Sequence, residues 1–202
     1  MAIYLIRHGE TASNAARVVQ TPDTPLSERG ISQAERLARR LAQEGIREIL
    51  SSDLPRALMT AERLEAATGA SIRPTPLLQE RNYGDIRGRP YADIGADILG
   101  PDYEPPGGER WSDFHARVDN AWIEVTQAAA RSRALAVVTH GLVCHSLATR
   151  HLQLPGGVGP TRWGNTSLTI IESHPPWIVR VLNSTAHLDR ETVDDERSRS
   201  GL

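Results

Sequence analysis

The sequence predicts an α/β fold with three layers, in which a mostly parallel central sheet is flanked by helices and a small irregular lid lobe is inserted around residues 81–108. Three observations lead to this prediction. Two short apolar runs, 3–6 and 135–139, are each followed closely by a His-Gly pair. Segments with helical periodicity lie between these runs. Glycine and proline interrupt the lobe too often for long regular elements.

The N-terminal half alternates between strands and helices. The run 3–6 is short and β-prone, which predicts a buried strand. A helix is expected over 27–45, because Ser follows a Pro-Leu pair as candidate N-cap and apolar residues recur at steps of three and four until a glycine. Residues 48–51 favour another strand, and Ser52 or Asp53 is expected to cap the next helix, which has proline in its first turn.

The C-terminal half repeats this alternation. Apolar residues from Trp111 to Ala129 mark a long helix, and we expect its apolar stripe to be core. The second His-Gly strand follows, then a helix that extends to about His151. Two late strands are expected near 167–172 and 177–182. Alternation of this kind favours a parallel sheet that is covered on both faces.

Length and composition limit the classes of protein that fit. With 202 residues, the chain suits one domain over 1–190, followed by a flexible charged tail over 191–202. No segment approaches the about 20 apolar residues of a membrane span, and no signal peptide is evident, so we expect a cytoplasmic protein. A formal charge of -2 argues against a nucleic-acid surface. The single cysteine, Cys144, argues against a disulfide or a zinc cluster.

Four nitrogen-rich side chains are expected to meet at one edge of the sheet. Arg7 and His8 follow the first strand, His140 follows a later one, and Arg56 lies in the first turn of a helix. Parallel sheets bind ligands at the carboxyl ends of their strands, so the two imidazoles face each other if these strands are neighbours. A helix start favours anions, and arginine forks match phosphoryl oxygens. A phosphoryl group is therefore the expected guest.

Four motifs in order resemble those of the histidine phosphatase superfamily, the fold of cofactor-dependent phosphoglycerate mutases and of many small phosphatases. The first, Arg-His-Gly-Glu-Thr at 7–11, is followed by Asn14. The second runs through 51–57, the third is Leu-Gln-Glu at 78–80, and the fourth is Thr-His-Gly at 139–141. The resemblance covers nearly the whole chain, and four motifs with the right context are far more specific than the first one alone.

The resemblance implies a role for each residue of these motifs. His8 would be the nucleophile that attacks phosphorus, while Arg7, Arg56 and His140 would hold the phosphoryl oxygens. Glu80 would carry the proton, and for that role it should be shielded from water and have a raised pKa. Neither a metal ion nor another cofactor is implied. The implied substrate-binding residues are Asn14, Gln20, Thr21, Arg81, Tyr83 and Gly141.

Within the resembling family, two reactions remain open. The short stretch between Glu80 and His140 and the Pro-Pro-Gly-Gly-Glu segment at 105–109 resemble the broad-specificity and α-ribazole phosphatases. Arg81 and Tyr83 instead resemble the residues of mutases that hold a phosphoglycerate carboxylate. Two positions depart from the family pattern: Arg87 replaces a frequent acidic residue, and Thr21 replaces a glycine. We expect a phosphatase, with a mutase as the alternative.

The expected partner is a small phosphorylated metabolite, with phosphate or sulfate able to occupy the pocket, and neither nucleic acid nor a membrane. A non-catalytic phospho-ligand binding domain and a cysteine-dependent phosphatase are minor alternatives. Cys144 and Arg150 have the Cys-x5-Arg spacing, but no glycine lies between them and the segment suits a helix. Glu10 is expected to be structural. The remaining histidines are expected to be surface or packing residues: His115, His145, His151, His174 and His187.

Overall fold

The computed structural model describes residues 1–189, and the expected tail at 191–202 lies outside them. Within these residues one six-stranded sheet has the strand order β3-β2-β4-β1-β5-β6. The first four strands along the chain are parallel to one another, whereas β5 is antiparallel to both of its neighbours, β1 and β6. The strands are β1 (Ala2–Arg7), β2 (Glu48–Ser52), β3 (Ser71–Thr75), β4 (Ala134–Thr139), β5 (Leu168–Glu172) and β6 (Val179–Ser184). The predicted mostly parallel sheet is confirmed.

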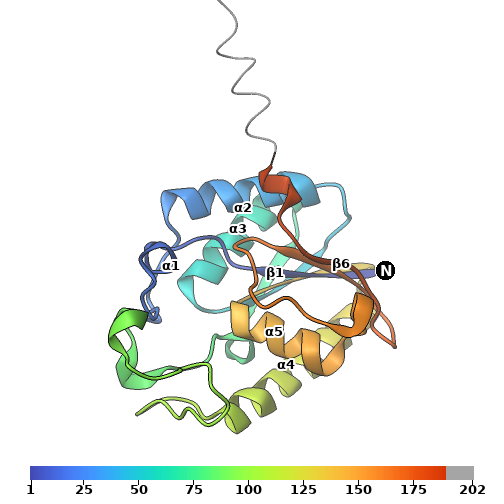
Figure 1. Cartoon of the computed structure of the whole chain (residues 1–202). Helices are drawn as coiled ribbons and strands as arrows, with labels where there is room; N and C mark the ends of the chain where they lie inside the picture. The colour runs from blue at the N-terminus through green and yellow to red at the C-terminus, as the bar shows by residue number, and fades with distance from the viewer. Residues whose placement is uncertain (190–202) are drawn as a thin grey trace, which may run out of the picture.

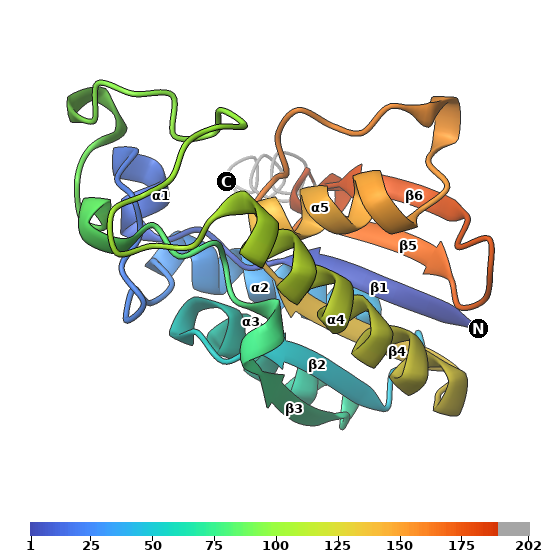
Figure 2. The ribbon, with the colours of Figure 1, turned by 90° about the horizontal axis from the view of Figure 1, so that it is seen from below.

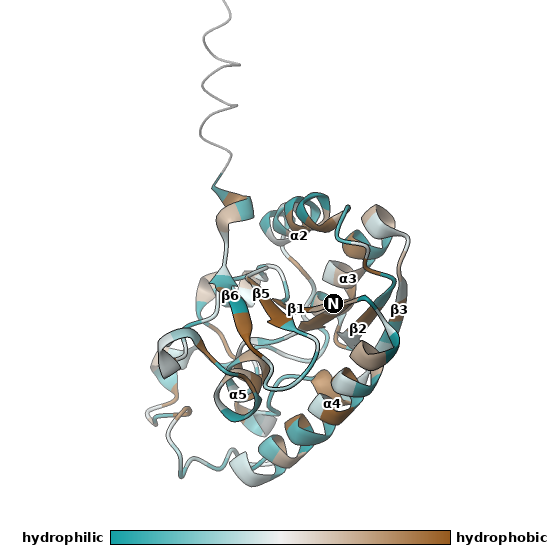
Figure 3. Ribbon diagram, turned by 90° about the vertical axis from the view of Figure 1, so that its right-hand side faces the viewer, coloured by the Kyte–Doolittle hydropathy of each residue, from teal (hydrophilic) through white to brown (hydrophobic). Residues whose placement is uncertain are grey.

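Helices cover both faces of the sheet, which confirms the three layers (Figure 1). Side chains alternate along β1: Ile3 and Leu5 pack under α4 and α5, while Tyr4 and Ile6 pack under α2 and α3. Figure 3 shows the apolar strands enclosed between these two layers. The helices are α1 (Ala12–Ala16), α2 (Glu28–Leu41), α3 (Pro55–Thr68), α4 (Trp111–Arg131) and α5 (Gly141–His151). None of the described helices is long and apolar enough to cross a membrane.

The structure confirms the predicted N-cap of α2 and corrects that of α3. Ser27 caps α2 as expected, because its side chain accepts a hydrogen bond from the backbone N–H of Gly30. Neither Ser52 nor Asp53 caps α3, whose N-cap is Leu54 in an extended conformation without a side-chain cap. Proline at the first helical position disfavours the helical conformation in the residue before it, so the cap falls one residue later.

Three elements differ from the sequence prediction. The helix α1 was not expected, and it begins at a capping box formed by Thr11 and Asn14. The edge strand β3 was not expected either, because it contains Pro74 and has little apolar alternation. The strand predicted at 177–182 begins later, at Val179, because Trp177 has a φ of 59° and cannot extend the ladder.

The segment 81–108 forms a lobe beside α1, above the carboxyl ends of the strands (Figures 1 and 2). It contains only short 3-10 turns, η2 (Gly84–Ile86) and η3 (Tyr91–Asp93), so the predicted irregular lobe is confirmed. Gly84 has a φ of 52°, and a Cβ atom there would lie 2.0 Å from the carbonyl oxygen of Pro106. Only glycine allows the two ends of the lobe to approach this closely. The remaining short turns are η1 (Pro76–Leu78), η4 (Pro155–Gly157) and η5 (Ala186–Leu188).

Candidate active site

Two histidines meet where β1 and β4 end. The strands are parallel neighbours in a register that pairs Arg7 with Thr139, so His8 and His140 emerge side by side. Their ring centroids are 5.0 Å apart, and the two residues are 1% and 0% exposed. The expectation that the two imidazoles face each other is confirmed. The pairing of β1 with β4 therefore brings together two histidines that are about 130 residues apart in the sequence.

A close backbone contact fixes the turn that follows His8. A Cβ atom on Gly9 would lie 2.5 Å from the carbonyl oxygen of Gly30, so the start of α2 packs directly on this turn. The N–H of Gly9 donates to the hydroxyl of Thr60 on α3 at 3.1 Å. Both helices of one layer thus hold the residue after His8. The packing of α2 therefore requires a glycine directly after His8.

The ring of His8 is held in one tautomer and kept neutral. Its Nδ1 lies 2.7 Å from the carbonyl oxygen of Gly9, so Nδ1 carries the proton and Nε2 keeps a free lone pair. Burial, together with the positive charges of Arg7 and Arg56, holds the pKa of His8 well below its ordinary value. At neutral pH this ring is therefore neutral, and its Nε2 carries no proton.

The ring of His140 is oriented by a serine. Its Nε2 lies 2.8 Å from Oγ of Ser52, which in turn accepts a hydrogen bond from the N–H of Leu54 at 3.3 Å. Burial and the nearby positive charge of Arg56 hold the pKa of His140 well below its ordinary value. With the Ser52 hydroxyl as the donor to Nε2, the proton of the neutral ring lies on Nδ1. This Nδ1 is buried and has no hydrogen-bond partner among residues 1–189.

Two arginines, the half-buried Arg7 and the buried Arg56, present further unpaired donors. Arg7 donates from Nη1 to the carbonyl oxygen of Trp163 at 2.5 Å, and Arg56 donates from Nη1 to that of Thr21 at 3.3 Å. The Nε atoms of both arginines are buried without a partner in the described chain. Burial lowers the pKa of Arg7 and lowers that of Arg56 to about 10, so both stay cationic at neutral pH. Buried unsatisfied donors of this kind indicate that a ligand completes the site.

The predicted proton carrier, Glu80, lies at the same edge of the sheet. Its Oε1 accepts the N–H of Arg81 at 3.1 Å, and its Oε2 accepts the N–H of Leu142 at 3.2 Å. Loss of solvent raises the pKa of Glu80 above its ordinary value, although these hydrogen bonds and Arg56 act in the opposite direction. A half-buried carboxyl with a raised pKa keeps its proton to a higher pH than an exposed one, so it can donate that proton and take one back.

A cavity of about 780 Å³ is lined by Arg7, Arg56 and Glu80, while His8 and His140 are not among its lining residues. All six residues that the sequence suggested for substrate binding line it: Asn14, Gln20, Thr21, Arg81, Tyr83 and Gly141. Arg81 is already occupied, because its guanidinium donates to the carbonyl oxygens of three residues at the base of the lobe, Ile98, Tyr103 and Glu109. It also lies 3.8 Å from the ring centroid of Trp111. Arg81 therefore anchors the lobe, and its contact with substrate stays a prediction.

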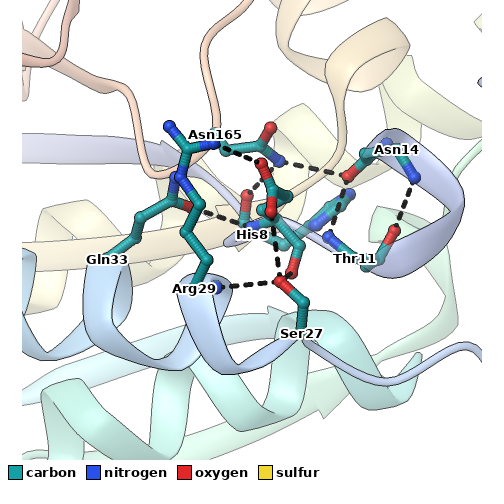
Figure 4. A network of polar contacts seen from close by, with 9 residues as sticks. His8, Thr11, Asn14, Ser27, Arg29, Gln33 and Asn165 are labelled. Atoms are coloured by element: carbon teal, nitrogen blue, oxygen red, sulfur yellow. Dashed lines mark hydrogen bonds and ion pairs between the residues drawn. The ribbon is translucent and has the colours of Figure 1, made fainter. Parts of the chain in front are cut away.

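Sequence reasoning missed Asn165, which joins the two motifs around His8. The side-chain Nδ2 of Asn165 donates to the backbone oxygen of His8 and to Oδ1 of Asn14, both at 3.2 Å (Figure 4). The next residue, Thr166, donates its N–H to the same His8 oxygen at 3.2 Å. Asn165 lies in the loop before β5, 157 positions from His8, so no local pattern could have placed it here.

The predicted structural role of Glu10 agrees with its contacts. Its carboxylate lies 3.4 Å from Arg29 and 3.3 Å from the hydroxyl of Ser27, and its N–H donates to Gln33 at 2.9 Å. Figure 4 shows these partners, on or beside the first turns of α2, gathered next to His8. Glu10 therefore ties the turn after His8 to α2, and it does not line the cavity.

Two expectations for other residues are tested by the structure. His145 is exposed as predicted, yet it also lines the cavity, because it lies one helical turn after Gly141. Cys144 is fully buried inside α5, and burial raises the pKa of its thiol. A protonated, inaccessible thiol is no nucleophile, so the cysteine-dependent alternative is wrong. No group of three or more metal-ligating side chains occurs within residues 1–189.

Comparisons with known proteins agree with this geometry. The model of the histidine phosphatase superfamily (branch 1) matches residues 3–184. The probable phosphoglycerate mutase GpmB of Yersinia pestis is 33% identical over 217 aligned positions, which cover 96% of this chain and 98% of the relative.

Two solved structures share the fold. A mycobacterial glucosyl-3-phosphoglycerate phosphatase in complex with VO3 has 30% identity and a TM-score of 0.78, with 91% of this chain and 99% of that chain covered. The α-ribazole phosphatase of Shigella flexneri has 27% identity and a TM-score of 0.79, with coverages of 92% and 97%. The relatives thus include both phosphatases and a mutase. This chain belongs to the histidine phosphatase superfamily.

Proposed function

We propose that this chain is a phosphatase that hydrolyses small phosphate monoesters through a phosphohistidine on His8, without a metal ion. One observation carries the proposal. Three buried donors, on Arg7, Arg56 and His140, have no hydrogen-bond partner among residues 1–189. They adjoin a neutral imidazole whose Nε2 has a free lone pair. A phosphoryl group supplies the oxygens that these donors lack, and it places phosphorus beside the nucleophile.

The first step transfers the phosphoryl group to the enzyme. The lone pair of His8 Nε2 forms a bond to phosphorus as the bond from phosphorus to the ester oxygen breaks. The leaving oxygen takes the proton of the Glu80 carboxyl, whose raised pKa keeps that proton available. The carbonyl oxygen of Gly9, which accepts from Nδ1 at 2.7 Å, stabilises the positive charge of the phosphorylated ring.

The second step returns the enzyme to its starting state. A water molecule attacks phosphorus, and its proton passes to the Glu80 carboxylate. The phosphorus–nitrogen bond breaks, its electron pair returns to Nε2 of His8, and inorganic phosphate leaves. The same donors hold the phosphoryl oxygens in both steps, so charge stabilisation requires no rearrangement of the site. The cations of Arg7 and Arg56 replace the role that a metal ion has in other phosphoryl-transfer enzymes.

Two observations favour hydrolysis over a mutase reaction. The solved relatives with the coverage given above are phosphatases, of glucosyl-3-phosphoglycerate and of α-ribazole phosphate by their names. Arg81, the residue that would hold a phosphoglycerate carboxylate, already donates to three backbone carbonyl oxygens. The mutase remains the second candidate because of the similarity to GpmB over almost the whole chain.

The test is hydrolysis of 4-nitrophenyl phosphate in excess EDTA. We expect the wild type to be active and His8→Ala to lose at least about 1,000-fold in kcat, as when a covalent nucleophile is removed. His174→Ala, an exposed histidine, and Cys144→Ser are the matched controls and should keep activity. An acid quench should trap phosphate on the wild-type protein in an acid-labile, alkali-stable form. Activity that survives in His8→Ala, or that EDTA abolishes, would contradict the proposal.

A second assay separates the two candidate reactions. The enzyme is given 3-phosphoglycerate together with a catalytic amount of 2,3-bisphosphoglycerate. A phosphatase releases inorganic phosphate faster than it forms 2-phosphoglycerate, whereas a mutase does the reverse. Isomerisation faster than hydrolysis would replace the proposed reaction with phosphoryl transfer between substrate hydroxyls, with His8 in the same role.

A further inference from the structure

Three arginines stand at the mouth of the cavity, outside the groups that the mechanism uses. Arg17, Arg87 and Arg162, here called the rim arginines, line the same cavity as Arg7 and Arg56. Arg17 and Arg162 are exposed and Arg87 is half-buried. None of the three side chains has a hydrogen bond or an ion pair with any residue in the range 1–189. Three unpaired cations in one cavity indicate an anion that is absent from the chain itself.

A short antiparallel ribbon holds two of them on the same side. The N–H of Gly88 donates to the oxygen of Val19 at 2.7 Å, and the N–H of Tyr91 donates to the oxygen of Arg17 at 3.0 Å. Residues 17–21 thus pair with 87–91, and Arg17 and Arg87 of this ribbon both line the cavity. The ribbon joins the turn after His8 to the lobe, so its register fixes Arg17 and Arg87 over the site.

The third rim arginine comes from another element. Arg162 precedes Trp163, whose carbonyl oxygen accepts from Arg7 at 2.5 Å. Arg162 therefore lies near Arg7, the arginine at the end of β1. The two sets of arginines repel each other: Arg162 contributes to lowering the pKa of Arg7, and Arg87 contributes to lowering that of Arg56. The rim arginines are close enough to extend the positive field of the phosphoryl site.

The charges of the cavity do not balance without a ligand. Two carboxylates line it, Glu80 and Asp97. Burial favours the neutral form of Glu80, and Asp97 accepts the backbone N–H of Leu99 at 3.1 Å. One phosphoryl group pairs with Arg7 and Arg56, which leaves the three rim cations without a counter-charge. The backbone conformation does not favour an arginine at position 17 either, because Arg17 has a φ of 56°, in the left-handed region that favours glycine.

We propose that the rim arginines bind a second anionic group of the substrate, a carboxylate or a second phosphoryl group. The substrates are then phosphate monoesters that carry this group beyond the ester oxygen, and the inference rests on the phosphatase function proposed above. The linking part of the substrate would pack against the apolar and aromatic side chains that also line the cavity. These are Tyr83, Tyr91, Ile98, Leu99, Trp111 and Leu142.

The test uses two aryl phosphates that differ in charge alone. 4-(Carboxymethyl)phenyl phosphate and 4-(carbamoylmethyl)phenyl phosphate have the same shape, and the methylene group isolates the ring from the terminal group. The measured quantity is the ratio of kcat/KM for the acid to kcat/KM for the amide. We expect a wild-type ratio of about tenfold or more, the size of one charge-assisted hydrogen bond. The ratio should fall as salt is added, because exposed charges are screened.

Variants of the rim arginines test whether these residues cause the preference for the acid over the amide. Arg87→Gln should lower the ratio several-fold, and the triple variant Arg17→Gln/Arg87→Gln/Arg162→Gln should bring it to about one. Arg89→Gln is the matched control: it lies on the same ribbon, does not line the cavity, and its guanidinium donates to the oxygen of Asp93. A wild-type ratio near one, or a ratio that the triple variant leaves unchanged, would overturn the inference. Thermal melting verifies that each variant is folded.

A binding measurement distinguishes failure of this inference from failure of the proposed function. If no phosphate ester is hydrolysed, the proposed function fails, and titration calorimetry of His8→Ala with the same two compounds still tests the rim. Tighter binding of the acid supports the second anion site, and equal binding rejects it. A third compound, 4-(phosphonomethyl)phenyl phosphate, distinguishes the sources of the anion. A larger preference for it than for the carboxylate assigns the site to a second phosphoryl group, and a smaller preference assigns it to a carboxylate.

Discussion

The floor and the rim of the cavity are built in opposite ways. The floor consists of Arg7, Arg56 and Glu80, which line the cavity, together with the neighbouring His8 and His140, which are 1% and 0% exposed. The rim consists of a short ribbon, the lobe and the loop before β5, whose arginines are exposed or half-buried. Regular hydrogen-bonded structure fixes the floor, whereas irregular segments carry the rim. Under the proposed function, the residues at the edge of the sheet carry out the same reaction on every substrate. The irregular segments above them would then select which phosphate ester binds.

The two regions also differ in electrostatics. Burial lowers the pKa of Arg56 to about 10, a sign that its charge is held away from water. Interactions with such a desolvated cation are strong and nearly independent of salt, while those of the exposed Arg17 are weak and screened. Changes in the floor should therefore affect the rate for every substrate, and changes in the rim should affect the choice among substrates. The following predictions test this division, from the largest expected effect to the smallest.

Glu80→Gln removes the proton carrier of the floor and should cause the largest loss. We expect kcat to fall by about 100-fold to 10,000-fold for phenyl phosphate, and less for 4-nitrophenyl phosphate, whose leaving group needs no proton. Wild-type activity on phenyl phosphate should decline as pH rises through the raised pKa of Glu80, because the first step needs the protonated carboxyl. The variant should lack this decline. Equal losses for the two substrates would contradict the role of Glu80 as a proton carrier.

Arg56→Ala removes one floor cation and should lower kcat/KM by about 100-fold to 1,000-fold for the acid and the amide substrates alike. The reason is that Arg56 contacts the phosphoryl group, which every substrate shares. Arg63→Ala, on the same helix but half-exposed and outside the cavity, is the matched control and should have little effect. An Arg56→Ala variant that changes the ratio of the two substrates more than their rates would place this residue in the rim instead.

Asn165→Ala should have an intermediate effect, since Asn165 is a positioning residue that holds the backbone of His8 and the side chain of Asn14. The loss of two hydrogen bonds predicts a decrease in kcat of about threefold to tenfold with a small change in KM. The rate of phosphohistidine formation in a single turnover should fall by the same factor. A change in the melting temperature without a change in this rate would assign Asn165 to stability alone.

The smallest effect concerns stability and pH. Burial lowers the pKa values of His8 and His140, and it lowers that of His187, whose ring contacts Thr166, to about 4. The unfolded chain binds protons on these rings near pH 6.5 while the folded chain does not, so the free energy of unfolding should fall as pH falls below about 6.5. Urea midpoints at pH 8 and pH 5 measure this fall. His187→Gln should reduce it slightly, and an unchanged difference between the two pH values would exclude a contribution of His187.

Most of the floor could be predicted from the sequence. His8 and His140 follow directly on strands, Arg56 lies in the first turn of a helix, and a compact apolar run before a His-Gly pair is a local signal. Glu80 lies in the loop after η1, and it was placed by its position in the resembling motif. Arg56 was placed by Pro55, which starts α3 even though the expected caps, Ser52 and Asp53, do not cap it. Ser52 instead serves the site, because its hydroxyl contacts His140. Local sequence patterns thus located β1, β4 and α3. They assigned a capping role to Ser52, however, whose hydroxyl instead contacts His140.

What the sequence by itself determined is the layered α/β fold, and it predicted the residues that we propose to react, since both depend on short patterns of apolar, glycine and charged residues. What only the tertiary structure decided is which distant residues contact one another in and around the site. Asn165 reaches His8 because β5 pairs with β1, and Arg81 is occupied by the carbonyl oxygens of its own lobe. The rim arginines come together through a ribbon and a loop. Such contacts are non-local, and their geometry depends on the packing of the whole chain.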